Sequence, residues 1–179
     1  GIDCNKRDSN GSTPLLVAAA NGDSKIIGLL VAHGADILCT DQARDGALHL
    51  AVRRNIVEAV QQLIELKAEL DAQNALGQTP LMVAAVHNLE RMIQAFLSAG
   101  AKTGIQDQKG RTVVHIAVSH HCSELAIEQI IDACEQQTLN LVDSKGETPL
   151  MAATQQGSTA SFRLLLEHKV DVTTRDREG

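Results

Sequence analysis

The chain has 179 residues, and 44% of them are hydrophobic, but Phe96 and Phe162 are its only Phe, Tyr or Trp side chains. We therefore expect a core of Leu, Ile, Val and Ala, and we expect the aromatic anchors typical of interfaces to come mostly from a partner. The formal net charge of −6 repels phosphate backbones, which argues against nucleic acid as a direct ligand. No apolar run approaches the length of a membrane span, so membrane insertion is not expected.

Four cysteines are scattered along the chain without the C-x-x-C spacing of metal or redox motifs; they are Cys4, Cys39, Cys122 and Cys134. This pattern is typical of free thiols in a reducing compartment. The first residues, Gly1 to Asn5, contain no apolar signal region. We expect the protein to work in the cytoplasm, the nucleus or both.

A repeat with a nearly constant period runs through the sequence. Each unit opens with an acidic or amide residue, and these residues are Asp8, Asp41, Asn74, Asp107, Asp143 and Asp176. The intervals between them are 33, 33, 33, 36 and 33 residues. A period of this size predicts an all-α repeat solenoid, in which each unit buries its apolar surface against its neighbours.

Within each unit the sequence predicts a short first helix. The segments 13–19, 79–85 and 148–153 begin with Thr-Pro-Leu, and weaker copies lie at 47–52 and 112–118. Thr can cap the free N–H groups of the first turn. Pro at the first helical position loses no hydrogen bond and has its φ already set. Small Ala residues then keep this helix narrow, so that neighbouring units can approach closely.

A second, wider helix follows in each unit, because large apolar residues recur at three- and four-residue spacing. These sets lie at 26–30, 60–64, 93–97, 127–131 and 162–166. Gly34 and Gly100 are expected to end this helix in two of the units, since Gly adopts the left-handed conformation that follows many helix C-termini.

The pattern D-x-x-G-x-T-P-L-H-x-A-A, followed by a Gly, Leu-Leu and G-A-D, resembles the ankyrin repeat family over the whole chain. The resemblance implies a curved stack of helix–turn–helix units with β-hairpin fingers along one edge. We predict a single ankyrin-repeat domain over 1–179, with five complete repeats that start near 8, 41, 74, 107 and 143. Residues 1–7 and 176–179 are expected to be parts of flanking repeats, and the chain is expected to be a segment of a longer array.

Two repeats depart from this pattern. In the second, Arg44 stands at the position of the turn Gly and Gly46-Ala47 replaces Thr-Pro, so Asp45 is expected to cap the helix one residue early. In the fourth, three extra residues are expected within 132–140, as a longer loop after the second helix. Each departure has two interpretations, which are ordinary drift and adaptation to a partner.

The sequence does not indicate a site for chemistry. His120, His121 and Cys122 are clustered metal-type ligands, but adjacent residues on a turn rarely converge on one ion, and we interpret them as a polar turn in which His121 replaces Gly. His49 and His115 occupy the His of T-P-L-H, which the resemblance makes structural, with a hydrogen bond between neighbouring repeats. Without a nucleophile motif or a Gly-rich phosphate loop, we expect no enzyme activity, no cofactor and no metal.

The resemblance implies that a partner protein or extended peptide binds to the concave face, which the finger tips and the ends of the first helices form. Carried over position by position, it assigns partner binding to Asp45, Arg53, Arg54, Leu76, Gln78, Val86, His87, Lys109, Arg111, Ser119, His120, Lys145, Gln155 and Gln156. The middle of this set is basic although the chain is acidic, which indicates an acidic or mixed peptide, or a folded partner with an acidic edge. The alternative is that these charges only keep the stack soluble.

Three functions are compatible with this sequence. The first is a non-catalytic, monomeric protein–protein interaction module. The second is an inhibitor of a Rel-type (NF-kappa-B) transcription factor, a family of inhibitors that is also built from ankyrin repeats with a lengthened repeat. The third is a regulatory or docking segment of a larger enzyme or channel. Fold alone does not choose among them.

Replacement of Arg53, Arg54 and Arg111 by Glu is expected to weaken partner binding without much loss of stability. The measurement is an affinity pull-down from eukaryotic cell extract followed by mass spectrometry. An unchanged set of partners would move the binding site to another face of the stack.

Overall fold

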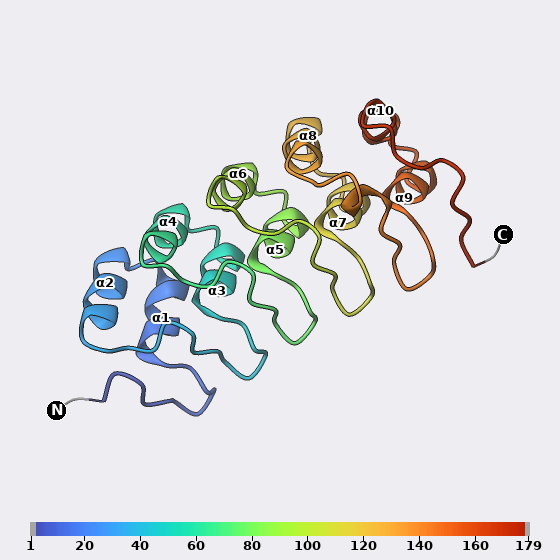
Figure 1. The fold of residues 1–179 in the computed structure, drawn as a ribbon. Coiled ribbons are helices and arrows are strands. Elements are labelled where there is room, and N and C mark those ends of the chain that lie inside the picture. Colours follow the sequence, from blue (N-terminus) through green and yellow to red (C-terminus); the bar gives the residue numbers. More distant parts are fainter. Residues whose placement is uncertain (1–2, 178–179) are drawn as a thin grey trace.

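Two layers of short helices and a row of loops make up the computed structural model, which describes residues 3–177 (Figure 1). The inner layer consists of α1 (Pro14–Asn21), α3 (Ala47–Arg53), α5 (Pro80–Val86), α7 (Val113–Ser119) and α9 (Pro149–Gln155). The outer layer consists of α2 (Ser24–Ala32), α4 (Val57–Glu65), α6 (Glu90–Ser98), α8 (Glu124–Asp132) and α10 (Thr159–Glu167). Each helix packs on the next helix of its own layer, which confirms the predicted all-α solenoid. The predicted flanking parts include residues 1, 2, 178 and 179, which lie outside the described residues.

Three of the inner helices begin with the predicted threonine cap, which is supplied by Thr13, Thr79 and Thr148. Each hydroxyl accepts a hydrogen bond, 3.3–3.4 Å long, from the backbone N–H three residues later. In the second repeat the N-cap is Gly46, which has no side chain to make such a bond. The expectation that Asp45 caps this helix is therefore wrong, because its carboxylate binds Arg53 and Asn74 instead.

The finger of each repeat is a loop that the opening acidic or amide residue organises. In the fourth repeat Oδ1 of Asp107 accepts the backbone N–H groups of Lys109 at 2.8 Å and of Arg111 at 2.9 Å, in the manner of an Asx-turn. The same pair of bonds is made by Asp8, Asp41, Asn74 and Asp143. Within residues 3–177 the only β-type pairing is an isolated bridge between Thr40 and Gly46. The predicted β-hairpin fingers are thus tight loops rather than paired strands.

From the second repeat to the fifth, backbone hydrogen bonds join each finger to the next one. The N–H of Ala75 donates to the carbonyl of Ala43 at 2.9 Å, and the N–H of Gln108 donates to the carbonyl of Leu76 at 3.1 Å. The N–H of Ser144 donates to the carbonyl of Lys109 at 2.8 Å. The fingers lie so close that a Cβ at Gly77, whose φ is +72°, would come within 2.7 Å of the backbone nitrogen of Gln108. From the second to the fifth repeat the fingers therefore form one continuous row.

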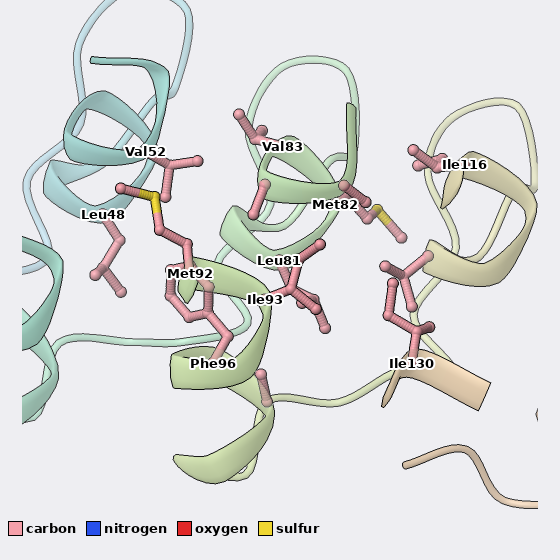
Figure 2. Close-up of a cluster of buried hydrophobic side chains, with 14 of the residues drawn as sticks. Leu48, Val52, Leu81, Met82, Val83, Met92, Ile93, Phe96, Ile116 and Ile130 are labelled. Atoms are coloured by element: carbon pink, nitrogen blue, oxygen red, sulfur yellow. The ribbon is translucent and has the colours of Figure 1, made fainter. Parts of the chain in front are cut away.

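The hydrophobic core lies between the two layers and between successive repeats. Figure 2 shows one region of it, which includes Leu48, Val52, Leu81, Met92, Ile93 and Phe96. All six side chains are at most 3% exposed. Phe96 is fully buried, whereas Phe162 is only partly buried against the core. The core is therefore almost entirely aliphatic, as the composition predicts.

The three additional residues of the fourth repeat are divided between two places. The turn from α7 to α8 runs from Ser119 to Glu124, which is one residue longer than the turn from Val86 to Glu90 in the third repeat. The other two lengthen the connection after α8, which contains the 3-10 helix η1 (Thr138–Asn140). The expectation of one longer loop over 132–140 is thus correct only in part.

Two buried histidines connect neighbouring repeats. Nδ1 of His49 accepts the N–H of Gly46 at 3.2 Å, and its Nε2 lies 2.9 Å from the carbonyl oxygen of Gln78. Because this N–H can only donate and this carbonyl can only accept, the ring is neutral with its proton on Nε2. His115 repeats the arrangement between the N–H of Thr112 at 3.1 Å and the carbonyl of Glu147 at 3.0 Å, and the predicted link between repeats is confirmed. Burial lowers the pKa of both imidazoles.

These histidines should make the fold less stable in mild acid. Their pKa in the folded chain lies below the ordinary value of 6.5, so the unfolded state binds more protons once the pH falls below 6.5. The contribution of the two neutral histidines to the stability of the fold is complete above pH 6.5. It is lost as the pH falls from 6.5 toward their lowered pKa values. Thermal unfolding followed by circular dichroism should therefore give a midpoint that falls between pH 7.5 and 5.

The variant His49→Met/His115→Met should show a smaller fall over the same range. Met is the matched replacement, because Met151 occupies the same position in the fifth repeat and its Sδ accepts the N–H of Thr148 at 3.4 Å. An equal pH dependence in the variant and the parent chain would contradict the assignment.

Candidate functional site: a concave groove

The predicted partner-binding residues come from two parts of each repeat that face one another. One part is the finger, and the other is the C-terminal end of the inner helix. Side chains eight residues apart bridge the two, since Arg53 Nε lies 2.9 Å from Asp45 Oδ2 and Gln155 Nε2 lies 2.8 Å from Glu147 Oε1. The angle between the finger row and the inner helices, lined by the fourteen predicted residues, is the concave groove.

In the second repeat Asp45 is a buried anchor rather than an exposed contact. It is 4% exposed, and its Oδ1 also accepts a hydrogen bond from Asn74 Nδ2 at 2.9 Å. The guanidinium of Arg53 that it holds keeps a side chain that is 38% exposed. Arg54 is exposed and has no ion pair among the described residues. Asp45 can therefore act on a partner only through Arg53, which it orients.

The expectation that the middle of the predicted set is basic is correct only in part, because the arginines lie in the second and fourth repeats and the third repeat between them presents Leu76 and Val86. Leu76 at the finger tip is 58% exposed. Val86 and Gln78 are half-buried, and His87 is exposed. Leu76 and Val86 thus form an apolar spot that is open to solvent at Leu76, and it lies between the arginines of the second repeat and the basic residues of the fourth.

Between the fourth and fifth repeats the groove deepens into a hollow of about 220 Å³. Six of the predicted residues line it, and they are Lys109, Arg111, Ser119, Lys145, Gln155 and Gln156. The fingers supply its cationic side chains, and the end of α9 supplies its amides. These six residues, which the sequence places in two different repeats, are brought together by the stacking.

Arg111 is held at this hollow by a buried carboxylate. Asp107 is 7% exposed, and its Oδ2 accepts Nε of Arg111 at 3.0 Å and Nη2 at 2.8 Å. Lys145 is 73% exposed at its side chain and lies 4.0 Å from Glu147, a distance at the outer limit for an ion pair. Lys109 is exposed and, like Arg54, has no ion pair among residues 3–177.

A row of basic side chains follows the ends of three consecutive inner helices, where Arg54, His87 and His120 are the C-cap residues of α3, α5 and α7. Partial burial lowers the pKa of His120, and the positive charge of Arg111 and the neighbouring histidines adds to this effect.

The cluster at residues 120–122 is separated by the fold. His121 has a φ of +52° and occupies the left-handed turn position, as predicted for a residue that replaces Gly. Cys122 turns inward, where its Sγ lies 3.0 Å from the carbonyl oxygen of Ala85 in the preceding repeat. In the described part of the chain no group of three or more His, Cys, Asp or Glu side chains could hold a metal ion. No helix within residues 3–177 is both long and apolar enough to cross a membrane.

Sequence reasoning missed two residues of the groove, Asn74 and Asp107. They open their repeats, and the sequence indicates that role, but they also anchor the side chains that line the groove. The signal for Asp107 is its position four residues before Arg111, because this separation is short enough for an ion pair between the two side chains. The contact of Asn74 with Asp45 joins two repeats, so no local spacing indicates it.

The stacked helix pairs and the row of fingers define a class of protein, the helical repeat solenoid (Figure 1). Three overlapping matches to the family described as "Ankyrin repeats (3 copies)" cover residues 1–74, 16–107 and 81–176. The chain belongs to the ankyrin repeat family, whose members bind protein partners and are generally non-catalytic.

Three relatives illustrate the range of proteins that contain similar segments. The chain is 31% identical to the mouse B-cell lymphoma 3 protein homolog over 142 residues, which are 76% of this chain and 32% of that protein. It is 30% identical to human Rabankyrin-5 over 169 residues, with 88% and 14% covered. It is 27% identical to human transient receptor potential cation channel subfamily A member 1 over 172 residues, with 93% and 15% covered. The chain thus spans a third or less of each of these relatives.

The buried carboxylates change the expectation for charge reversal. A Glu at position 53 or 111 would place a second carboxylate against Asp45 or Asp107, each of which is at most 7% exposed. Removing the partner of a buried charge and adding a like charge are both destabilising. For Arg53 and Arg111 we therefore expect charge reversal to lower stability, whereas for Arg54 the expectation of little change stays as it was.

Arg53→Ala should lower the free energy of unfolding by about 1–2 kcal/mol, because it removes a charged hydrogen-bond donor from the buried Asp45. The neighbouring Arg54→Ala is the matched control and should change it by less than about 0.5 kcal/mol. Urea unfolding followed by circular dichroism measures both values. Equal effects of the two substitutions would contradict the anchoring of Arg53.

Proposed function

We propose that this chain is a non-catalytic interaction module that binds, as a monomer, the acidic side chains of a partner protein or peptide in the concave groove. We place this function in the cytoplasm or nucleus. The observation that carries the proposal is that Arg54 and Lys109 are exposed in the groove without ion pairs among the described residues, although the net charge of the chain is −6.

The physical argument concerns where charge is left uncompensated. Each of the two buried carboxylates, Asp45 and Asp107, already holds one arginine of the groove. The remaining cations, Arg54 and Lys109, should therefore give the groove a local positive potential, which Asp143 and Glu147 reduce at the hollow. Such a potential speeds the encounter with an acidic surface and selects against basic ones. Charges kept only for solubility would need no buried anchors, and Arg53 and Arg111 both have one.

A second candidate is a docking or regulatory segment of a larger protein. It is supported by the small share of the relatives that the chain spans, and one of those relatives is a cation channel by name. Inhibition of a Rel-type transcription factor stays a third candidate. Its structural support is weaker than the sequence indicates, because the extra residues of the fourth repeat are divided between two short connections.

The test is charge reversal at Arg54, Lys109 and Lys145, which avoids both arginines with buried anchors. The variant Arg54→Glu/Lys109→Glu/Lys145→Glu should lose most partners captured from eukaryotic cell extract, as quantified by mass spectrometry, because each change replaces an attraction by a repulsion. Its thermal unfolding midpoint should stay within a few degrees of that of the parent chain.

The matched control carries the same change in net charge on the outer layer, as Lys25→Glu/Arg91→Glu/Arg163→Glu, where all three residues are exposed. The control should retain the partners. Loss of the same partners from both variants would make the effect one of net charge, and retention by both would place the binding site elsewhere.

A further inference from the structure

We infer that the occupant of the concave groove is a polyproline II segment of the partner in which an acidic, an apolar and a second acidic residue follow one another at intervals of three. This inference rests on the proposed function and specifies the ligand of the same groove. It is carried by the order of side chains along the second, third and fourth repeats and by the spacing of the inner helices.

The chemistry alternates from one repeat to the next. The second repeat presents Arg53 and Arg54 to the groove, and the fourth presents Lys109 and Arg111. Between them the third repeat presents an exposed Leu76 and a half-buried Val86. A segment that crosses the three repeats therefore meets a basic, an apolar and a basic site in that order.

The helix spacing sets the interval. The inner helices α3, α5 and α7 pack directly on one another, and packed helices have axes roughly 8–10 Å apart. A polyproline II segment has three residues per turn and rises about 3.1 Å per residue, so residues three apart lie on the same edge at a separation of about 9 Å. In a β-strand, residues three apart point to opposite faces. Polyproline II is therefore the extended form whose period matches the repeats.

The width of the groove favours an extended chain over a helix. In the second and fifth repeats a single side chain spans from the inner helix to the finger, through the bonds of Arg53 with Asp45 and of Gln155 with Glu147. These bonds close the base of the groove, since Asp45 and Glu147 directly precede the N-cap residues Gly46 and Thr148. A helix with its side chains is about 10–12 Å wide and fits such a narrow base less well than an extended chain. A polyproline II chain has no internal hydrogen bonds, and the half-buried amide of Gln78 lies in the middle repeat, where it can bond to such a backbone.

The charge of each basic site matches a carboxylate. In the second repeat two guanidinium groups and one buried carboxylate leave a single net positive charge. Within the fourth repeat Lys109, Arg111 and Asp107 leave the same net charge, and the carboxylates of Asp143 and Glu147 in the adjoining finger leave no room for a larger negative charge. Glu or Asp carries one negative charge, whereas a phosphorylated side chain carries close to two. An unmodified acidic residue at each end of the motif therefore neutralises its site without excess.

The test uses synthetic peptides and fluorescence polarisation at pH 7.5. The probe is a labelled twelve-residue peptide with glutamate, leucine and glutamate at three-residue intervals and with proline and threonine as spacers. A control peptide of the same composition has the second glutamate moved outward by one residue, which rotates it off the binding edge. The probe should bind about tenfold more tightly than the control, and its affinity should fall as salt is added.

Substitutions locate the probe. Leu76→Ser should weaken the probe about fivefold or more, as should Arg54→Glu, while the outer-layer variant Arg163→Glu should bind it as the parent chain does. Equal binding of the probe and the shifted control to the parent chain would overturn the three-residue interval. If the Arg54→Glu variant then bound neither peptide, the proposed function of the groove would still stand. Binding of neither peptide would also overturn the motif, and the pull-down from extract then decides the proposed function separately.

Discussion

The structure depends on the inability of any one repeat to be stable by itself. The inner helices are seven or eight residues long and the outer ones nine, which is too short for a helix that is stable alone in water. Each pair also has apolar residues on both of its faces. Met92 and Phe96 of α6, for example, lie beside Leu48 and Val52 of the preceding repeat in Figure 2. Only stacking covers these surfaces, so the separation of the repeats is set by side-chain packing.

The fingers are then positioned by that separation. Each finger is closed by its own Asx-type hydrogen bonds, but its place beside the next finger depends on the helices from which both project. The short backbone bonds from Ala75 to Ala43 and from Ser144 to Lys109 form because the packed helices bring the loops to hydrogen-bond distance. His49 and His115 add side-chain bonds across the same boundary, and these require a neutral ring. Helix packing and these hydrogen bonds together fix how each repeat is aligned with the next one.

The proposed binding groove depends on the same alignment of the repeats. Asp45 and Asp107 are buried by the stacking, and each then fixes an arginine whose other side faces solvent. The cost of burying the carboxylate is offset by the guanidinium and by backbone or amide donors. The result is a set of pre-oriented cations, which lowers the conformational entropy that a partner must remove on binding. Fold stability and the binding surface are therefore coupled at these arginines, while Arg54 and Lys109 contribute to the surface alone.

The sequence by itself determined the period, the two helices of each repeat, the threonine caps and the structural role of the two histidines. The period, the helices and the caps depend on residues within one unit or on a motif that recurs, so local spacing is sufficient to find them. The role of the histidines was implied by the resemblance to the ankyrin repeat family. Only the tertiary structure decided that Asp45 anchors Arg53 instead of capping α3, and that the extra residues of the fourth repeat are divided between two connections. It also brought Arg111 and Gln155 to one hollow. The pair of Arg53 and Asp45 lies within one repeat, but Asp45 is also bonded to Asn74 of the next repeat. Arg111 and Gln155 belong to different repeats, and a contact between residues so far apart in the chain leaves no pattern in the spacing of either repeat.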